Sequence, residues 1–70
     1  MIPASLTWRD VEALAQALAE NHPGRDPLRV PPAELRRLIA RLPGFVDLPA
    51  EGTDADLEEI QSAWFDAAQE

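Results

Sequence analysis

The chain of 70 residues contains no cysteine, no lysine and no tyrosine, and it has one histidine. Without cysteine it can form no disulfide, no thiolate zinc site, no cysteine nucleophile and no iron–sulfur cluster held by its own thiolates. A basic stretch followed by an apolar run is also missing, and nowhere do about 18 apolar residues follow one another. We therefore expect neither a secretory signal nor a membrane span, and we predict a cytoplasmic protein.

Catalytic motifs are missing as well. No Ser/His/Asp or Cys/His arrangement and no glycine-rich phosphate loop can be defined. The histidine, His22, stands at an expected helix end beside Pro23, where a capping or surface role is the simplest interpretation. Asp54, Asp56 and Glu58 resemble the opening of a calcium loop, but the glycine and the closing glutamate of that motif are absent. We predict that the chain is not an enzyme and holds no cofactor tightly.

Acidic residues outnumber basic residues by 13 to 6, which gives a net charge of −7. Five of the six arginines lie in residues 25–46, whereas residues 47–70 contain eight acids and no base. A field of this sign repels nucleic acid and anionic lipid, and it attracts cations and basic protein surfaces. Arg36, Arg37 and Arg41 make the best case for DNA binding, but they are a small basic patch in an acidic chain. DNA binding is therefore the least favoured of the binding functions.

Three helices are predicted from apolar residues at helical spacing between start and stop signals. The first covers about residues 8–21, the second starts at Pro31 or Pro32 and ends before Pro43-Gly44, and the third covers about residues 54–68. Thr7 with Asp10 and Thr53 with Asp56 form potential capping boxes ahead of the first and third helices. In a capping box the threonine oxygen accepts a backbone hydrogen bond while the acid accepts one from the threonine N–H.

The connectors between the helices are rich in proline. Residues 22–32 contain four prolines and leave room for only brief extended pairing near Val30. Phe45, Val46 and Leu48 are expected either to pair with that region or to fill the core.

Trp8 and Trp64 fall on the apolar stripes of the first and third helices, so we predict that both pack in the core. The expected fold class is mainly α: three short helices with minimal or no β structure. Residues 1–5 are expected to be a loose lead-in, and residues 6–70 a single domain. We expect a monomer, because the three apolar stripes meet one another and leave no large apolar face uncovered.

Several short motifs together resemble the IscX family, the small acidic proteins of the bacterial iron–sulfur cluster assembly system. Residues 6–10, Leu-Thr-Trp-Arg-Asp, are similar to the L-x-W-x-D opening of that family. Asp26-Pro27, Phe45-x-Asp47-x-Pro49 and Trp64-x-Asp66 follow in the family's order and spacing. Each motif is weak alone, but together they cover residues 6–70 without a gap.

The resemblance implies a small, mostly helical fold related to the winged helix, with no known catalytic activity. It further implies an adaptor or regulator of cluster assembly that docks its acidic face on the cysteine desulfurase of the pathway. Weak binding of Fe²⁺ through exposed carboxylates is a second implied property. A ferrous iron carrier or sensor is therefore the alternative function, and a winged-helix DNA-binding protein is a less favoured one.

Seven acids are candidates for the partner-binding surface, four of them from exposure by helical phase and three from the resemblance. The first four are Glu20, Glu58, Glu59 and Asp66, and the other three are Asp10, Asp26 and Asp47. Weak candidates for Fe²⁺ are Glu20, Asp26, Glu58 and Glu59. Sites made only of exposed oxygen ligands bind iron weakly, because strong sites usually include imidazole or thiolate.

This chain departs from the family around Phe45. Family members often carry a dense acidic run there, whereas residues 42–49 of this chain contain one carboxylate, Asp47. The second helix is also more basic than the resemblance leads us to expect. Iron binding through that loop is therefore a weaker expectation than docking through the acidic third helix.

Overall fold

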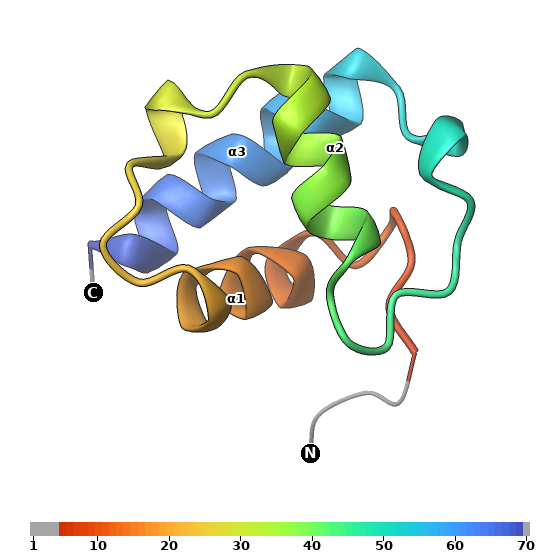
Figure 1. Ribbon diagram of the computed structural model, residues 1–70, viewed down its shortest axis with the longest axis horizontal. Helices are drawn as coiled ribbons and strands as arrows, with labels where there is room; N and C mark the ends of the chain where they lie inside the picture. Colours follow the sequence, from red (N-terminus) through yellow and green to blue (C-terminus); the bar gives the residue numbers. More distant parts are fainter. Residues whose placement is uncertain (1–4, 70) are drawn as a thin grey trace.

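The computed structural model describes residues 5–69 and contains three α-helices and two single-turn 3-10 helices in that range (Figure 1). These are α1 (Val11–Asn21), η1 (Pro27–Arg29), α2 (Pro32–Ala40), η2 (Pro49–Glu51) and α3 (Asp54–Ala68). The described part contains no β-strand, and its β pairing is an isolated parallel bridge between Leu6 and Phe45. The mainly helical fold class is confirmed. The predicted lead-in falls largely on residues 1–4, which lie outside the described residues.

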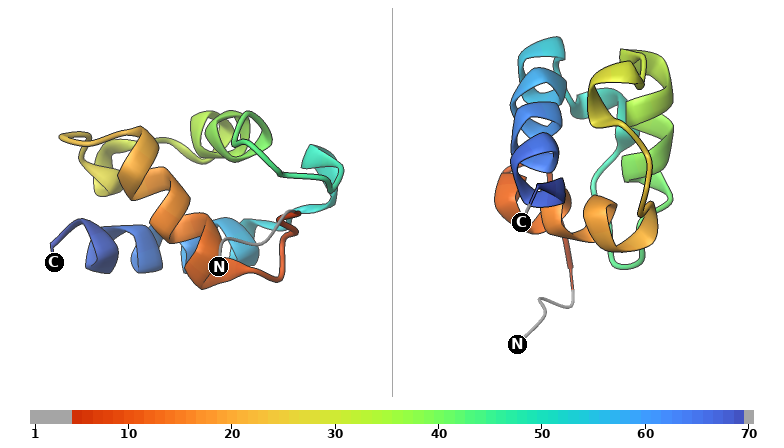
Figure 2. Two further views of the ribbon diagram at one scale, coloured as in Figure 1. Left: turned by 90° about the horizontal axis from the view of Figure 1, so that it is seen from below. Right: turned by 90° about the vertical axis from the view of Figure 1, so that its left-hand side faces the viewer.

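The three helices surround a common interior. α1 crosses α3 obliquely, as the left-hand view of Figure 2 shows, and α2 lies on the opposite side of the interior from α3. The right-hand view of Figure 2 shows α3 and α2 facing each other with α1 below. α1 and α3 share the most extensive helix-to-helix contact in the fold.

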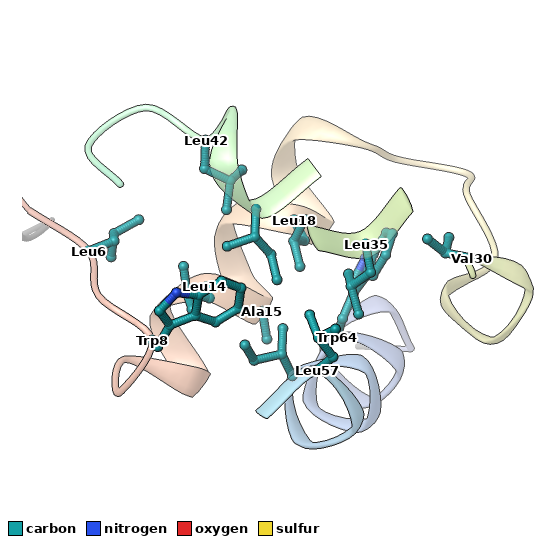
Figure 3. Close-up of a cluster of buried hydrophobic side chains, with 12 residues drawn as sticks. Leu6, Trp8, Leu14, Ala15, Leu18, Val30, Leu35, Leu42, Leu57 and Trp64 are labelled. Carbon is teal, nitrogen blue, oxygen red and sulfur yellow. The ribbon is translucent and has the colours of Figure 1, made fainter. Parts of the chain in front are cut away.

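The interior is filled by apolar side chains from every part of the described chain (Figure 3). The buried residues are Leu6, Trp8, Leu14, Ala15, Leu18, Val30, Leu35, Ile39, Leu42, Leu57, Ile60 and Trp64. Both tryptophans belong to this core, as predicted, and Trp64 is completely buried. Leu6, near the start of the described residues, is already a core residue.

α3 matches its prediction because its start signal works as expected. The Thr53 hydroxyl accepts a hydrogen bond from the Asp56 N–H at 3.1 Å, and Asp56 Oδ2 accepts one from the Thr53 N–H at 2.9 Å. Asp54 and Asp56 in the first turn also complement the positive end of the helix dipole. The predicted range of 54–68 is confirmed.

α1 begins at Val11, three residues later than predicted. Asp10 Oδ2 does accept a hydrogen bond from the Thr7 N–H at 2.9 Å, but the same oxygen also accepts the Thr7 hydroxyl at 3.1 Å. The Asp10 N–H donates to the Thr7 carbonyl oxygen at 3.0 Å, which closes a turn instead of a helix start. Only half of the expected capping box forms, so Trp8 lies in a turn that precedes the helix.

The predicted pairing of residues 45–48 with the Val30 region is wrong. The Leu6 N–H donates to the Gly44 carbonyl oxygen at 2.7 Å, and the Val46 N–H donates to the Leu6 carbonyl oxygen at 3.0 Å. The segment after α2 therefore pairs with the N-terminal segment. Leu6 is apolar, and it lies just ahead of the turn that precedes α1. Its pairing with Gly44 and Val46 therefore holds the N-terminal segment and the segment after α2 on the same side of the core.

The second expectation for this segment, that it fills the core, holds for one residue. Phe45 is half-buried, and its ring meets Trp8 edge-on with 5.3 Å between the ring centroids. Val46 and Leu48 are exposed. The segment thus places one aromatic ring against the core and two apolar side chains on the surface.

Candidate functional site

Acidic side chains border two hollows at the junction of α1 and α3. Where the two helices begin, a hollow is bordered by Trp8, Arg9, Val11 and four carboxylates, which are Asp47, Glu51, Asp56 and Glu59. Further along the same helices, a second hollow is bordered by Ala15, Gln16, Ala63, Ala67 and two carboxylates, Glu12 and Asp66. We call these two hollows, with the six carboxylates that border them, the acidic groove.

Helical phase places the acids on this groove. Glu59 and Asp66 are seven residues apart on α3 and therefore lie on the same side of that helix. Glu12 lies in the first turn of α1, where an acid also complements the helix dipole. Neither α1 nor α3 carries a lysine or an arginine, and Arg9 is the base that borders the first hollow. The groove is consequently a concentrated negative surface.

The loop that follows α2 closes one end of the groove. Asp47 Oδ2 accepts a hydrogen bond from the Trp8 N–H at 3.0 Å, and the Trp8 indole Nε1–H donates to the Leu48 carbonyl oxygen at 2.9 Å. These bonds join positions about 40 residues apart in sequence. The loop is thus fixed on the turn that precedes α1, and Asp47 is held at the mouth of the groove.

Arg36 of α2 fixes the other side of that loop. Its Nη1 donates hydrogen bonds to the carbonyl oxygens of Pro49 and Gly52, both at 2.6 Å, and its guanidinium lies 5.9 Å from the centroid of the Trp8 ring. The sequence indicated Arg36 only as one member of a small basic patch. In the structure Arg36 positions the backbone that carries Glu51.

Gly52 allows Trp8 to lie directly on this loop. A Cβ at position 52 would come within 2.5 Å of ring carbons of Trp8, far closer than atoms can approach. Gly52 itself is buried. No local pattern singles out Gly52, because its importance depends on a ring 44 positions earlier in the chain.

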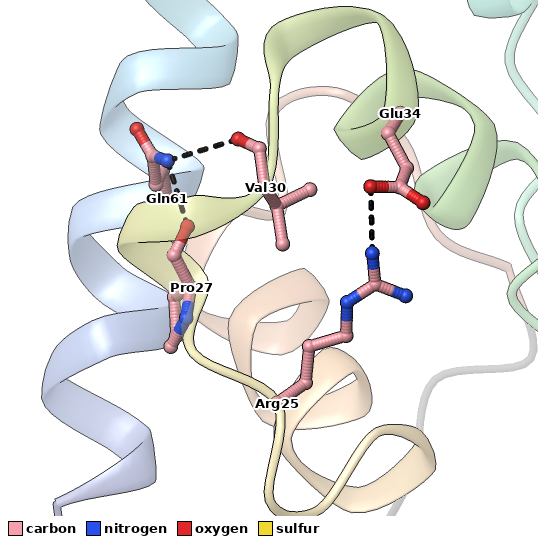
Figure 4. A network of polar contacts seen from close by, with 5 residues as sticks. All are labelled: Arg25, Pro27, Val30, Glu34 and Gln61. Carbon is pink, nitrogen blue, oxygen red and sulfur yellow. Dashed lines mark hydrogen bonds and ion pairs between the residues drawn. The ribbon is translucent and has the colours of Figure 1, made fainter.

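The arginines of the connector form ion pairs away from the groove. Arg25 pairs with Glu34 at 2.6 Å, and Gln61 Nε2 of α3 donates to the carbonyl oxygens of Pro27 and Val30 (Figure 4). These contacts attach the connector between α1 and α2 to the flank of α3. Arg25 and Arg29 therefore pair with Glu34 and Asp26, which do not border the acidic groove.

Three of the seven acids predicted for partner binding, Asp47, Glu59 and Asp66, are brought together in the groove. Asp10 adjoins it at the start of α1, where its carboxylate is used by the Thr7 turn. Asp26 caps η1 by accepting a hydrogen bond from the Leu28 N–H at 3.1 Å, and it also pairs with Arg29.

The last two predicted acids are exposed elsewhere. Glu20 lies in the final turn of α1. Glu58 borders a separate hollow on the other flank of α3, beside Val30 and Leu57. The seven acids predicted to form one partner-binding surface therefore lie at several separate places on the molecule.

Three acids of the groove were not among those predicted from the sequence to bind a partner. Glu12 could have been found from helical phase, since it is exposed on the α1 side that faces α3. Asp56 was assigned only to capping, although it also borders the groove. Glu51 enters the groove through the fold of η2 and its neighbours, which no local pattern indicates.

The predicted iron ligands do not form a shared site. Within residues 5–69, no three histidine, aspartate or glutamate side chains gather as they would around a metal ion. Glu59 lies in the groove, whereas Glu20, Asp26 and Glu58 lie at other places. Weak Fe²⁺ binding by individual carboxylates stays a prediction.

His22 lies at the C-terminal end of α1, where its backbone N–H donates to the Leu18 carbonyl oxygen at 2.9 Å. Its half-buried ring is 6.4 Å from the Trp64 ring, measured between centroids. This position agrees with the capping role expected from the sequence. In the described part of the chain, no helix has the length and apolar character needed to cross a membrane.

Comparison with known proteins identifies a family that this chain matches. A family model described as iron–sulphur cluster assembly matches residues 6–69. A protein of Pseudomonas aeruginosa that is described as uncharacterised is 42% identical over 62 residues, which cover 89% of this chain and 94% of that protein. No solved structure matches the chain.

Proposed function

This chain belongs to the iron–sulphur cluster assembly family, the family of IscX, and from that membership we propose an adaptor that docks on the cysteine desulfurase of the pathway. The resemblance found in the sequence is thereby confirmed at the level of the family. The family is one of assembly proteins, and we propose that this member acts by binding rather than by catalysis.

The observation that supports the proposal best is the acidic groove. Six carboxylates and one arginine border it, and the two helices that form it carry no base. Such a surface favours a partner with a complementary patch of lysine and arginine side chains. Opposite potentials raise the rate of encounter and orient the two proteins before contact.

The loop that contains η2 forms one wall of the groove and is fixed in position. The side chains of Arg36 and Trp8 donate hydrogen bonds to its backbone, so the carboxylates Asp47 and Glu51 are carried by a fixed backbone. A surface that is ordered before binding loses less conformational entropy when a partner docks. We propose that the adaptor binds as a preformed monomer, with small changes in its own structure.

Charge reversal in the groove tests the proposal. Glu59→Lys and Asp66→Lys each change the net charge from −7 to −5, and both side chains are exposed on a helix surface. Together they are expected to weaken binding to the desulfurase at least about tenfold, because two attractive contacts become repulsive. Isothermal titration calorimetry would measure the dissociation constant, and far-UV circular dichroism would check that the helices remain.

Glu34→Lys is the matched control. It also changes the net charge from −7 to −5, but it lies on α2, away from the groove, where its exposed pair with Arg25 adds little stability. Glu58→Lys, on the other flank of α3, would show how far the docking face extends. If Glu34→Lys weakens binding as much as Glu59→Lys does, net charge alone matters and the groove is not the docking face.

An NMR titration separates the adaptor from the iron carrier. Adding the desulfurase to labelled protein should broaden or shift the backbone signals of α1 and α3. Adding Fe²⁺ under anaerobic conditions would locate any weak iron site by paramagnetic broadening. A response to Fe²⁺ without any response to the desulfurase would favour the carrier and contradict the adaptor.

A further inference from the structure

Two exposed apolar side chains stand next to the acidic groove. Val46 is 62% exposed and Leu48 is 66% exposed. The backbone at Leu48 is extended, with φ −74° and ψ 129°, whereas the chain bends at Asp47. Asp47 lies between the two apolar residues, and its carboxylate accepts a hydrogen bond from the Trp8 N–H. The segment therefore offers two exposed apolar side chains, with the carboxylate between them directed toward the turn that precedes α1.

The backbone that carries this pair is tied to the core at both ends. The Val46 N–H donates to the carbonyl oxygen of the buried residue Leu6, and the Leu48 carbonyl oxygen accepts the indole N–H of the buried Trp8. Single apolar residues on a surface are ordinary, but a pair held on a fixed backbone is a ready contact. Little further ordering of the loop is needed for these side chains to enter a partner.

The charges around the pair indicate what kind of partner fits. Asp47 stands between the two residues and Glu51 follows them in the chain, and the groove that these two acids border carries four further carboxylates. An anionic membrane surface would be repelled, and so would the same face of a second copy. The complementary surface is a protein with an apolar depression rimmed by lysine or arginine, since interfaces place apolar contacts at the centre and charges at the rim.

We infer that Val46 and Leu48 are the apolar anchor of the docking surface and insert into a basic-rimmed apolar depression of the partner protein. The inference rests on the proposed adaptor function and deepens it. Electrostatic attraction through the groove then governs encounter, whereas the anchor supplies affinity that salt does not screen.

The test compares binding to the cysteine desulfurase at about 0.05 M and about 0.5 M NaCl, between which surface charges become screened. Val46→Ser with Leu48→Ser should weaken binding at least about tenfold at both salt concentrations, because the lost contact is apolar. Leu28→Ser is the matched control. Leu28 is 61% exposed and belongs to η1, which lies at the opposite end of the molecule from η2 (Figure 1).

The outcomes separate the inference from the function on which it rests. If the original chain binds and the double variant binds equally well, or if Leu28→Ser is equally harmful, the anchor is refuted while the adaptor function stands. If the original chain does not bind the desulfurase, both fall. If light scattering shows that the chain self-associates through Val46 and Leu48, the pair serves a second copy and the inference is overturned. Circular dichroism of each variant confirms that a loss of binding is not a loss of fold.

Discussion

Replacement of Gly52 by alanine should destabilise the protein although it adds a single methyl group at a loop position. Position 52 has φ −74° and ψ 127°, values that alanine adopts easily, so backbone strain plays no part. The added carbon would lie 2.5 Å from Cε2 and Cζ2 of Trp8 and 2.6 Å from Cη2. Carbon atoms in good contact are about 3.5–4.0 Å apart, so the ring or the loop must move by about 1 Å.

The ring has little room to move. Its Nε1–H is bonded to the Leu48 carbonyl oxygen, its face lies near the Arg36 guanidinium, and Phe45 packs against it edge-on. Overpacking at such a site costs about 1–3 kcal/mol of unfolding free energy. For a chain of 70 residues the total is about 4–10 kcal/mol. Each kcal/mol lowers the Tm of a domain of this size by roughly 4–8 °C.

Urea denaturation followed by far-UV circular dichroism would measure the change. A double-mutant cycle with Trp8→Phe isolates the cause, because phenylalanine lacks the second ring and the alanine should then cost less. The same variant should weaken desulfurase binding, since the displaced loop carries Asp47 and the anchor. If Gly52→Ala unfolds at the same urea concentration as the original chain, the packing argument is wrong.

Three further outcomes follow from the structure. Thr53→Ala should lower the unfolding free energy by about 1 kcal/mol, because it removes a complete capping box, and Thr7→Ala should cost less, because its hydroxyl accepts no hydrogen bond from the first turn of α1. Equal losses for the two variants in urea denaturation would contradict this. Trp64→Ala should cost about 3–5 kcal/mol, enough to leave much of the protein unfolded in circular dichroism spectra. Raising NaCl from about 0.05 to 0.5 M should weaken desulfurase binding severalfold in calorimetry, and an affinity independent of salt would refute the electrostatic part of the proposal.

The helices illustrate how far local sequence patterns reach. α3 was predicted over its full range because Thr53 and Asp56 satisfy each other without help from the rest of the chain. The same residue types at Thr7 and Asp10 form only half of a capping box, since the Asp10 N–H donates to the Thr7 carbonyl oxygen and not to the Thr7 hydroxyl. The turn that results is also bonded to a distant loop through the Trp8 N–H and Asp47, a contact that no local pattern indicates.

The candidate site shows the same division. Glu59 and Asp66 were predicted from their spacing on one helix, and they lie in the groove. Glu58 was grouped with them because it is exposed and acidic. Adjacent residues on an α-helix point in different directions, however, so Glu58 lies on the other flank of α3 from Glu59. Glu51 could not be found, because its position depends on the hydrogen bonds that Arg36 makes to the loop around it.

The amino-acid sequence by itself determined the helical class, the two core tryptophans, the separation of charge along the chain and the family. These follow from composition, periodicity and short motifs, which act over a few residues. Only the tertiary structure decided that the loop after α2 pairs with the N-terminal segment, that Arg36 and Gly52 hold it against Trp8, and that acids from three segments line one groove. The physical reason is that such contacts join residues 13 to 44 positions apart, whose distances are set by packing of the whole core.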